Sequence, residues 1–102
     1  MPFVLVVLPA AKTDILSAIT WYEYRQAELG EKFKIEITKA IDTLNDTVKE
    51  YGPSYMDLSR IFLKSFPYII YFKKDVVRQR IVIFAVLHEK QNRNEILRGR
   101  LK

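Results

Sequence analysis

Four residues in the second half of the chain have side chains suited to phosphate chemistry. His88 is the only histidine, and histidine is the residue type whose unperturbed pKa lies nearest neutrality. Arg60, Lys64 and Arg80 are cations that could hold a phosphate, the two arginines by bidentate contacts. Cleavage of RNA by its own 2′-hydroxyl needs a base, an acid and cations around the phosphate. These four residues are therefore the predicted catalytic set if the protein is a nuclease, and the sequence leaves open whether it is an enzyme.

The second proton-transfer group that this reaction needs is less evident. Tyr68 and Tyr71 are the candidates, and strand periodicity points them to opposite faces of a sheet, so only one can join His88. The structural alternative for His88 is a strand-end residue that hydrogen-bonds a backbone group. For Arg60 the alternative is an ion pair with an acidic residue.

The residue types exclude several other kinds of site. The chain has no cysteine, one histidine and no paired-carboxylate motif, so we expect no disulfide, no thiolate nucleophile and no metal site. Its three glycines are isolated at positions 30, 52 and 99, so no glycine-rich phosphate loop exists and no cofactor is expected. The absence of cysteine suits a cytoplasmic protein. The apolar run at 3–8 is too short for a membrane span, and it lacks the basic flank of a signal peptide.

Three aromatic residues, Trp21, Tyr22 and Tyr24, could form a platform on which bases stack. Their spacing matches the core positions of a helix. We therefore predict that they pack in the core.

Charge is distributed unevenly along the chain. The net charge is +5, and residues 60–102 hold 11 of the 17 basic residues but only 3 of the 12 acidic ones. This segment is expected to face something anionic, whether nucleic acid, an acidic protein or anionic lipid.

Apolar periodicity predicts a strand followed by two helices. Residues 3–8 form a continuous apolar run typical of a buried strand. A helix is predicted from about residue 10 to residue 27, with Gly30 as the residue that ends it. A second amphipathic helix is predicted from about Glu31 to Tyr51, where Gly52-Pro53 stops it. The short linker makes the two helices an antiparallel hairpin.

Three strands are predicted to follow. They cover residues 59–66, 68–72 and 79–88, with a turn at 73–75, and a short helix or tail comes after them. Short turns make them an antiparallel meander. The last strand is apolar on both faces, so it belongs inside the sheet with the first strand beside it. The prediction is a single α+β domain over 1–102, β-α-α-β-β-β in chain order and 1-4-3-2 in space, with the helical hairpin on one face.

Strand alternation assigns residues to the two faces of this sheet. Ile81, Ile83, Ala85 and Leu87 form a purely apolar set, which we assign to the helix-covered face. The opposite face then carries the four cationic candidates at its border and an apolar strip at its centre, made by Phe62, Val82, Phe84 and Val86. Such a strip is expected to bind a partner or to be covered by residues 92–101. A β-bulge would break this parity.

Three stretches of the sequence resemble a known family. They are the segment from Leu16 through Trp21-Tyr22 to Leu29-Gly30-Glu31-Lys32-Phe33, the segment from Arg60 through Leu63-Lys64-Ser65-Phe66-Pro67-Tyr68 to Tyr71, and Ile83–His88 followed by Asn92 and Arg98. Together they resemble the ParE branch of the RelE/ParE toxin superfamily, often labelled plasmid stabilisation proteins. The resemblance covers nearly the whole chain.

The resemblance implies the toxin of a type II toxin–antitoxin pair. Such a toxin is made beside a small antitoxin, whose flexible segment wraps and blocks it in a toxin–antitoxin hetero-oligomer. ParE-like members are similar to known inhibitors of DNA gyrase, and this is the predicted function. The alternative is a RelE-like toxin that cuts mRNA on the ribosome, and a small nucleic-acid-binding module ranks below both. The expected partner-binding residues are the apolar strip and Arg98.

The chain departs from the family pattern after His88. The family often has an arginine there, then a small residue or asparagine, and then a proline. Gln91 stands where that arginine is expected and Arg93 stands near the usual proline. A role tied to that arginine is therefore not carried over to this chain.

Overall fold

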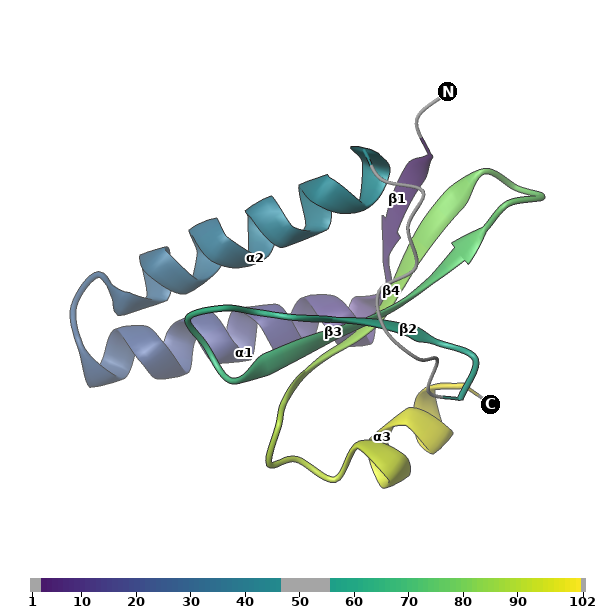
Figure 1. Cartoon of the computed structure of the whole chain (residues 1–102). Coiled ribbons are helices and arrows are strands. Elements are labelled where there is room, and N and C mark those ends of the chain that lie inside the picture. The colour runs from purple at the N-terminus through teal and green to yellow at the C-terminus, as the bar shows by residue number, and fades with distance from the viewer. Residues whose placement is uncertain (1–2, 47–55, 102) are drawn as a thin grey trace.

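Three helices and four strands make up the described part of the chain, residues 3–46 and 56–101, in a computed structural model (Figure 1). The elements are β1 (Val4–Val7), α1 (Pro9–Arg25), α2 (Leu29–Asp46), β2 (Ser59–Phe62), β3 (Tyr68–Asp75), β4 (Arg80–His88) and α3 (Arg93–Arg100). The predicted element order is confirmed, and the C-terminal segment forms a helix. The predicted continuation of the second helix to Tyr51 and its end at Gly52-Pro53 lie outside the described residues.

β4 lies inside the sheet, whose order β1-β4-β3-β2 is the predicted one. β1 runs parallel to β4, and β2, β3 and β4 form the antiparallel meander. α1 and α2 cover one face of the sheet, and α3 lies against the other (Figure 1). Because helices cover both faces, β4 is an almost continuous apolar run.

The strand ends differ from the predicted ones in two places. β2 stops at Phe62, and the amide of Leu63 then donates to the carbonyl of Tyr68 at the start of the connection to β3. The segment 73–75, predicted as a turn, is the end of β3. The turn lies at residues 76–79, where Gln79 takes a φ of 51°.

A β-bulge in β4 inverts the side-chain parity halfway along the strand. Tyr71 lies opposite Ala85 and Phe72 opposite Ile83, so Phe84 is the extra residue. Ile81 and Ile83 face α1 and α2 as predicted. After the bulge, the buried residue on the α1–α2 side is Val86, whereas Ala85 and Leu87 pack on the α3 side. The predicted faces of Ala85, Leu87, Val86 and His88 are therefore wrong, for the reason that a bulge shifts alternation by one residue.

α3 covers part of the face that the sequence left open. Leu97 is fully buried and packs with five residues of the sheet side: Leu58, Ile69, Tyr71, Ala85 and Leu87. An N-cap holds the start of this helix, because the side chain of Asn92 accepts a hydrogen bond from the amide of Glu95 at 3.2 Å. The sequence predicted that either a partner or residues 92–101 would cover this face. α3 belongs to that segment and covers this part of the face.

Gly30 does not end the first helix. α1 ends at Arg25, the chain turns through Glu28 with a φ of 72°, and Gly30 lies in the first turn of α2. A Cβ at this position would lie 2.6 Å from the carbonyl oxygen of Ile19 and 2.9 Å from the Cβ of Glu23. Glycine is therefore needed here because α1 and α2 approach each other closely.

Replacing Gly30 with alanine tests this close approach. The new methyl group meets backbone that belongs to α1, so Gly30→Ala should destabilise the protein by about 1–3 kcal/mol. Gly99→Ala is the matched control, because a Cβ there meets nothing within 4 Å. Alanine favours a helix over glycine, so this control should leave stability unchanged or raise it by up to about 1 kcal/mol. Urea unfolding measures both, and an equal effect of the two substitutions would contradict the packing role.

Candidate functional site

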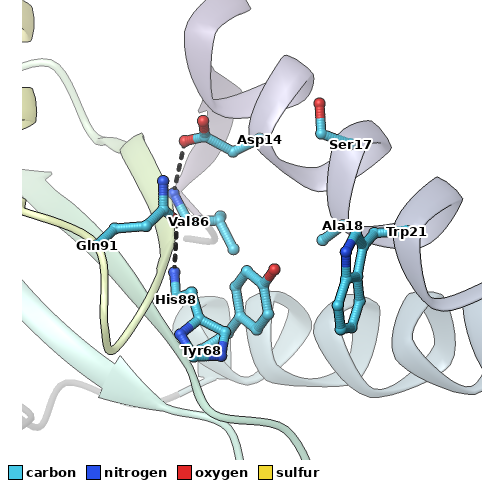
Figure 2. Close-up of a pocket in the computed structure, with 8 residues that line it drawn as sticks. All are labelled: Asp14, Ser17, Ala18, Trp21, Tyr68, Val86, His88 and Gln91. Atoms are coloured by element: carbon cyan, nitrogen blue, oxygen red, sulfur yellow. Dashed lines mark hydrogen bonds between the residues drawn. The ribbon is translucent and has the colours of Figure 1, made fainter.

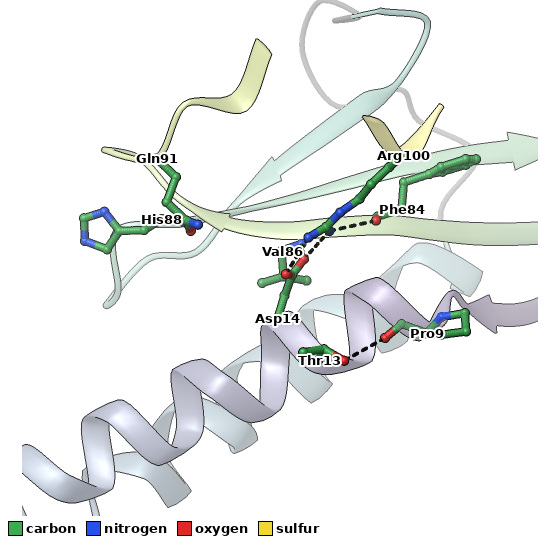
Figure 3. Close-up of polar contacts among 8 residues, drawn as sticks. All are labelled: Pro9, Thr13, Asp14, Phe84, Val86, His88, Gln91 and Arg100. Carbon is green, nitrogen blue, oxygen red and sulfur yellow. Dashed lines mark hydrogen bonds and ion pairs between the residues drawn. The ribbon is translucent and has the colours of Figure 1, made fainter. Parts of the chain in front are cut away.

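A partly buried ion pair joins α1, β4 and α3 beside the bulge (Figure 3). Asp14 of α1 receives two hydrogen bonds from the guanidinium of Arg100, one of them 2.8 Å from Nη2 to Oδ1. Its Oδ2 also accepts from the amide of Val86 at 2.9 Å. Nη1 of Arg100 donates to the carbonyl of Phe84 at 3.2 Å. The hydrogen bond with Asp14 raises the pKa of Arg100 against the opposing effect of burial, so the guanidinium stays charged.

This cluster replaces a missing strand. β1 pairs with residues 80–83 of β4 and then ends, so none of the described strands lies beside the outer edge of β4 from Phe84 onward. Backbone groups that point to this edge need other partners. Arg100 supplies one for the carbonyl of Phe84, and Asp14 supplies one for the amide of Val86. Gln91 supplies a third, because its Oε1 accepts from the amide of His88 at 2.8 Å.

A hollow of about 450 Å³ opens between α1 and this edge of β4 (Figure 2). The ring of Tyr68 meets the imidazole of His88 edge-on, with the ring centres 5.2 Å apart. The indole of Trp21 lies on the α1 side of the hollow (Figure 2). Both polar and apolar side chains line the hollow: Asp14, Ser17, Ala18, Trp21, Tyr68, Val86, His88 and Gln91.

The hydrogen bonds of His88 determine what its ring can do. Nδ1 accepts from the amide of Lys90 at 3.0 Å, which assigns the proton of the neutral ring to Nε2. In that form Nε2 donates a hydrogen bond and does not accept a proton. Gln91, at the position where the family pattern has an arginine, holds the same strand end from the other side. This geometry matches the structural alternative for His88, a strand-end residue bonded to backbone.

The predicted catalytic residues do not form one group. Arg60 lies opposite Tyr71, and Arg80 opposite Asp75, on the α3 side of the sheet. Nε of Arg80 pairs with the carboxylate of Asp75 at 3.4 Å. His88 instead lines the hollow against α1. Lys64 lies beyond the end of β2, beside α2. The prediction that these four share one face is therefore wrong, because the bulge moves His88 across and β2 ends before Lys64.

The predicted partner strip is divided in the same way. Phe62, Val82 and Phe84 remain on the α3 side, and Phe62 is exposed, with the guanidinium of Arg60 over its ring. Val82 is buried, and Val86 is buried on the opposite side under α1. Arg98 is exposed on α3, where it lines a separate shallow hollow.

The aromatic residues of α1 behave differently from one another. Tyr22 is buried and stacks near Phe33, as predicted for a core position. Trp21 and Tyr24 are exposed, so the predicted core role is wrong for these two. The reason is that α1 carries apolar residues on two sides, and periodicity alone cannot say which side is covered.

Two tyrosines of the α1 side have raised pKa values. Burial raises the pKa of Tyr68, and the nearby Tyr22 and Asp14 raise it further. Burial also raises the pKa of Tyr22. Within residues 3–46 and 56–101, no group of three metal-binding side chains is placed to hold an ion, and no helix is long and apolar enough to cross a membrane.

Asp14 and Arg100 were not singled out from the sequence. They are 86 positions apart, and neither belongs to a motif. The only available signal was an acidic residue among the apolar positions of the first helix. That signal does not name the partner.

The fold and the sequence together identify the class of protein. Residues 5–93 match the family described as the ParE toxin of the type II toxin–antitoxin system parDE. The chain belongs to this family of type II toxins, and the resemblance inferred from the sequence is confirmed.

Solved structures show the same fold. The chromosomal ParDE TA system from P. aeruginosa matches with 17% identity and a TM-score of 0.75, over 84% of this chain and 95% of that chain. A mutant of E. coli toxin RelE in the free state matches with 12% identity and a TM-score of 0.52, over 99% of this chain and 96% of that chain. The comparison with curated proteins found no match.

Removing the charge of Asp14 tests the ion pair. Asp14→Asn leaves the half-buried guanidinium of Arg100 without its counter-charge, so we expect a loss of about 1–3 kcal/mol in unfolding free energy. Asp75→Asn is the control, because its partners Arg78 and Arg80 are more exposed and the effect should be smaller. Urea unfolding gives both values. A larger effect at Asp75 would show that the Asp14 cluster does not hold the fold together.

The raised pKa of Tyr68 predicts a loss of stability in alkali. The folded state holds the phenol proton more tightly than the unfolded state, so this contribution is present below the ordinary tyrosine pKa and is lost as pH rises through the folded value. Urea unfolding at a series of pH values from neutral to above 10 should show a decline that Tyr68→Phe reduces. Tyr24→Phe, which removes an exposed phenol, should leave the decline unchanged.

Proposed function

We propose that this toxin acts by binding and inhibiting DNA gyrase, and that a cognate antitoxin neutralises it. Gyrase inhibition is the activity that resemblance to the ParE branch implies, and the family match over residues 5–93 supports that branch. Gyrase is a cytoplasmic enzyme, so the proposed site of action is the cytoplasm. A toxin that acts by binding needs a shaped surface and no set of catalytic groups.

The observation that carries this proposal is the separation of His88 from Arg60 and Arg80. A ribonuclease that used these residues would need them around one phosphate. They lie instead on opposite sides of the sheet. The ring of His88 is further held in the form that donates from Nε2, because Nδ1 accepts from Lys90. The arrangement favours binding over cleavage.

The alternative is a RelE-like ribosome-dependent endoribonuclease. It is supported by the hollow that Tyr68, His88 and Asp14 line, since all three side chains are able to transfer protons. The hollow lacks a described arginine or lysine among its lining residues. A simple nucleic-acid-binding module gains no support beyond the chain's basic charge.

A cognate antitoxin is the proposed partner, as the family description and the ParDE structure from P. aeruginosa suggest. Of the residues predicted to bind it, Phe62 and Arg98 are exposed and remain candidates. Val82 and Val86 are buried, so contact with either one would require the fold to open.

Two assays run in parallel on purified protein test the proposed target. The wild-type protein should inhibit gyrase supercoiling and leave mRNA intact on ribosomes. His88→Ala should retain this inhibition, because His88 only holds a strand end. Cleavage of mRNA that His88→Ala abolishes would establish the nuclease alternative instead. If induction of the protein does no harm to cells, the toxin function itself is wrong.

A further inference from the structure

The turn between β3 and β4 presents two large apolar side chains to solvent. Val76 and Val77 are 68% and 93% exposed, at the end of the sheet away from the α1–α2 connection (Figure 1). We call residues 73–80 the hairpin tip. Turns between antiparallel strands most often hold glycine, asparagine, aspartate or serine. The needs of the turn therefore do not explain two consecutive valines.

The backbone of the hairpin tip holds the valines in a defined place. Gln79 takes a φ of 51°, in the left-handed region that glycine and asparagine adopt more readily. Its amide donates to the carbonyl of Val76 at 3.3 Å, and its carbonyl accepts from the amide of Val4 in β1 at 2.9 Å. The turn is thus closed on itself and attached to the neighbouring strand.

Positive charge surrounds the two valines. Residues 73–80 contain four basic residues and one acidic residue, which gives the hairpin tip a net charge of +3. Two of the basic residues precede the turn and two belong to its second half or follow it. They are Lys73, Lys74, Arg78 and Arg80.

Asp75, the acidic residue of the hairpin tip, is bound by the arginines beside it. Its Oδ1 accepts from the amide of Arg78 at 3.1 Å. Its Oδ2 lies 3.2 Å from Nη1 of Arg78 and 3.4 Å from Nε of Arg80. The backbone hydrogen bond from Arg78 is the main cause that lowers the pKa of Asp75, so the carboxylate is ionised at neutral pH. The side chains of the two arginines stay 69% and 41% exposed.

The basic residues project from both faces of the hairpin. Nζ of Lys74 lies 4.9 Å from the ring centre of Phe3, which packs against the core under α1 and α2. Arg80 lies on the α3 side of the sheet. Strand alternation places Lys73 on the α3 side as well. A molecule that receives the valines would therefore meet cations on both sides of them.

This combination fits a groove of DNA. A row of phosphates follows each wall of the groove, and proteins that bend DNA insert an apolar side chain between base pairs from the minor groove. Surfaces that bind membranes use tryptophan, phenylalanine and leucine, and residues 73–80 include none of these. The centres of protein interfaces are depleted in charge and rich in tryptophan and tyrosine, which the hairpin tip also does not match.

We propose that the hairpin tip contacts the DNA that gyrase holds, with Val76 and Val77 as an apolar wedge between base pairs and the basic residues on the phosphates of both strands. This inference rests on the proposed function, because gyrase brings the DNA to the toxin. Three phosphate contacts predict an affinity for DNA alone that falls about 40-fold between 50 and 200 mM salt. The hairpin tip therefore adds to gyrase binding and is not a separate nucleic-acid-binding module.

A mismatched duplex tests the wedge. The probe is a fluorescent duplex of about 20 base pairs, intact or with one central mismatch, and anisotropy measures its binding to the whole toxin. A mismatch lowers the cost of unstacking, so the wild type should bind the mismatched duplex about five- to tenfold more tightly. Val76→Ser with Val77→Ser should abolish this preference. Leu16→Ser with Ile35→Ser is the matched control, because these aliphatic side chains are 64% and 47% exposed on α1 and α2.

A second pair of variants tests the phosphate contacts. Lys73→Gln with Arg78→Gln should lower the slope of log affinity against log salt by about 1.8, because each lost phosphate contact accounts for about 0.9. Lys32→Gln with Lys34→Gln removes the same charge from exposed positions of α2 and should leave the slope unchanged. Circular dichroism and urea unfolding confirm that all four variants are folded.

Several results would overturn the proposal. Equal binding of intact and mismatched duplexes by the wild type overturns the wedge. Tip variants that behave like their controls overturn the contact with DNA. Binding to vesicles of phosphatidylcholine and phosphatidylserine, without binding to DNA, would assign the hairpin tip to a membrane instead.

The supercoiling assay separates failure of this inference from failure of the proposed function. The tip variants should inhibit gyrase more weakly than their controls do. A wild type that inhibits gyrase, with tip variants that inhibit it equally well, overturns this inference and leaves the proposed function standing. A wild type that does not inhibit gyrase overturns the proposed function, and with it the claim that gyrase supplies the DNA.

Discussion

The hydrogen bonds of the Asp14 carboxylate are the contact on which the rest of this fold depends. This carboxylate is the only group that the described part of the chain places in hydrogen-bond contact with both β4 and α3 from α1. Its charge is matched by Arg100, and Arg100 in turn reaches the carbonyl of Phe84. A fork of charge-assisted hydrogen bonds therefore ties a helix on one side of the sheet to a helix on the other. α3 is short, and both the buried side chain of Leu97 and this fork of hydrogen bonds hold it against the sheet.

The contacts of Asp14 are needed because β1 is short. β1 covers four residues of β4 and leaves the rest of that edge without a strand. The side chains of Asp14, Gln91 and Arg100 close it, which also blocks the edge against uncontrolled pairing with other chains. The bulge at Phe84 sits where β1 stops. It turns Val86 and His88 toward α1 and so creates the hollow between α1 and the end of β4.

The architecture could be predicted from the sequence because it depends on local patterns. Alternation, helical periodicity and the burial of the most apolar strand are enough to order the elements. The bulge could not be predicted, because β4 is apolar on both faces and an extra residue at Phe84 changes no pattern. The predicted catalytic site was wrong for the same reason, because the bulge moves His88 to the opposite face from Arg60 and Arg80. The pairing of Asp14 with Arg100 was hidden among 12 acidic and 17 basic residues. The exposure of Trp21 and Tyr24 could not be predicted because both have the spacing of core residues.

The parallel pairing of β1 with β4 also sets the order in which the chain can fold as it is synthesised. The α1–α2 hairpin involves neighbouring segments, so it can form while the rest of the chain is still being made. β1 and Asp14 must wait for residues 72 to 86 positions further on before their partners exist. Until β4 leaves the ribosome, the core side of α1 has only α2 to pack against. The hydrogen bonds between Asp14 and Arg100 therefore form last. The surface of the folded toxin is complete only when the C-terminal third of the chain has been translated.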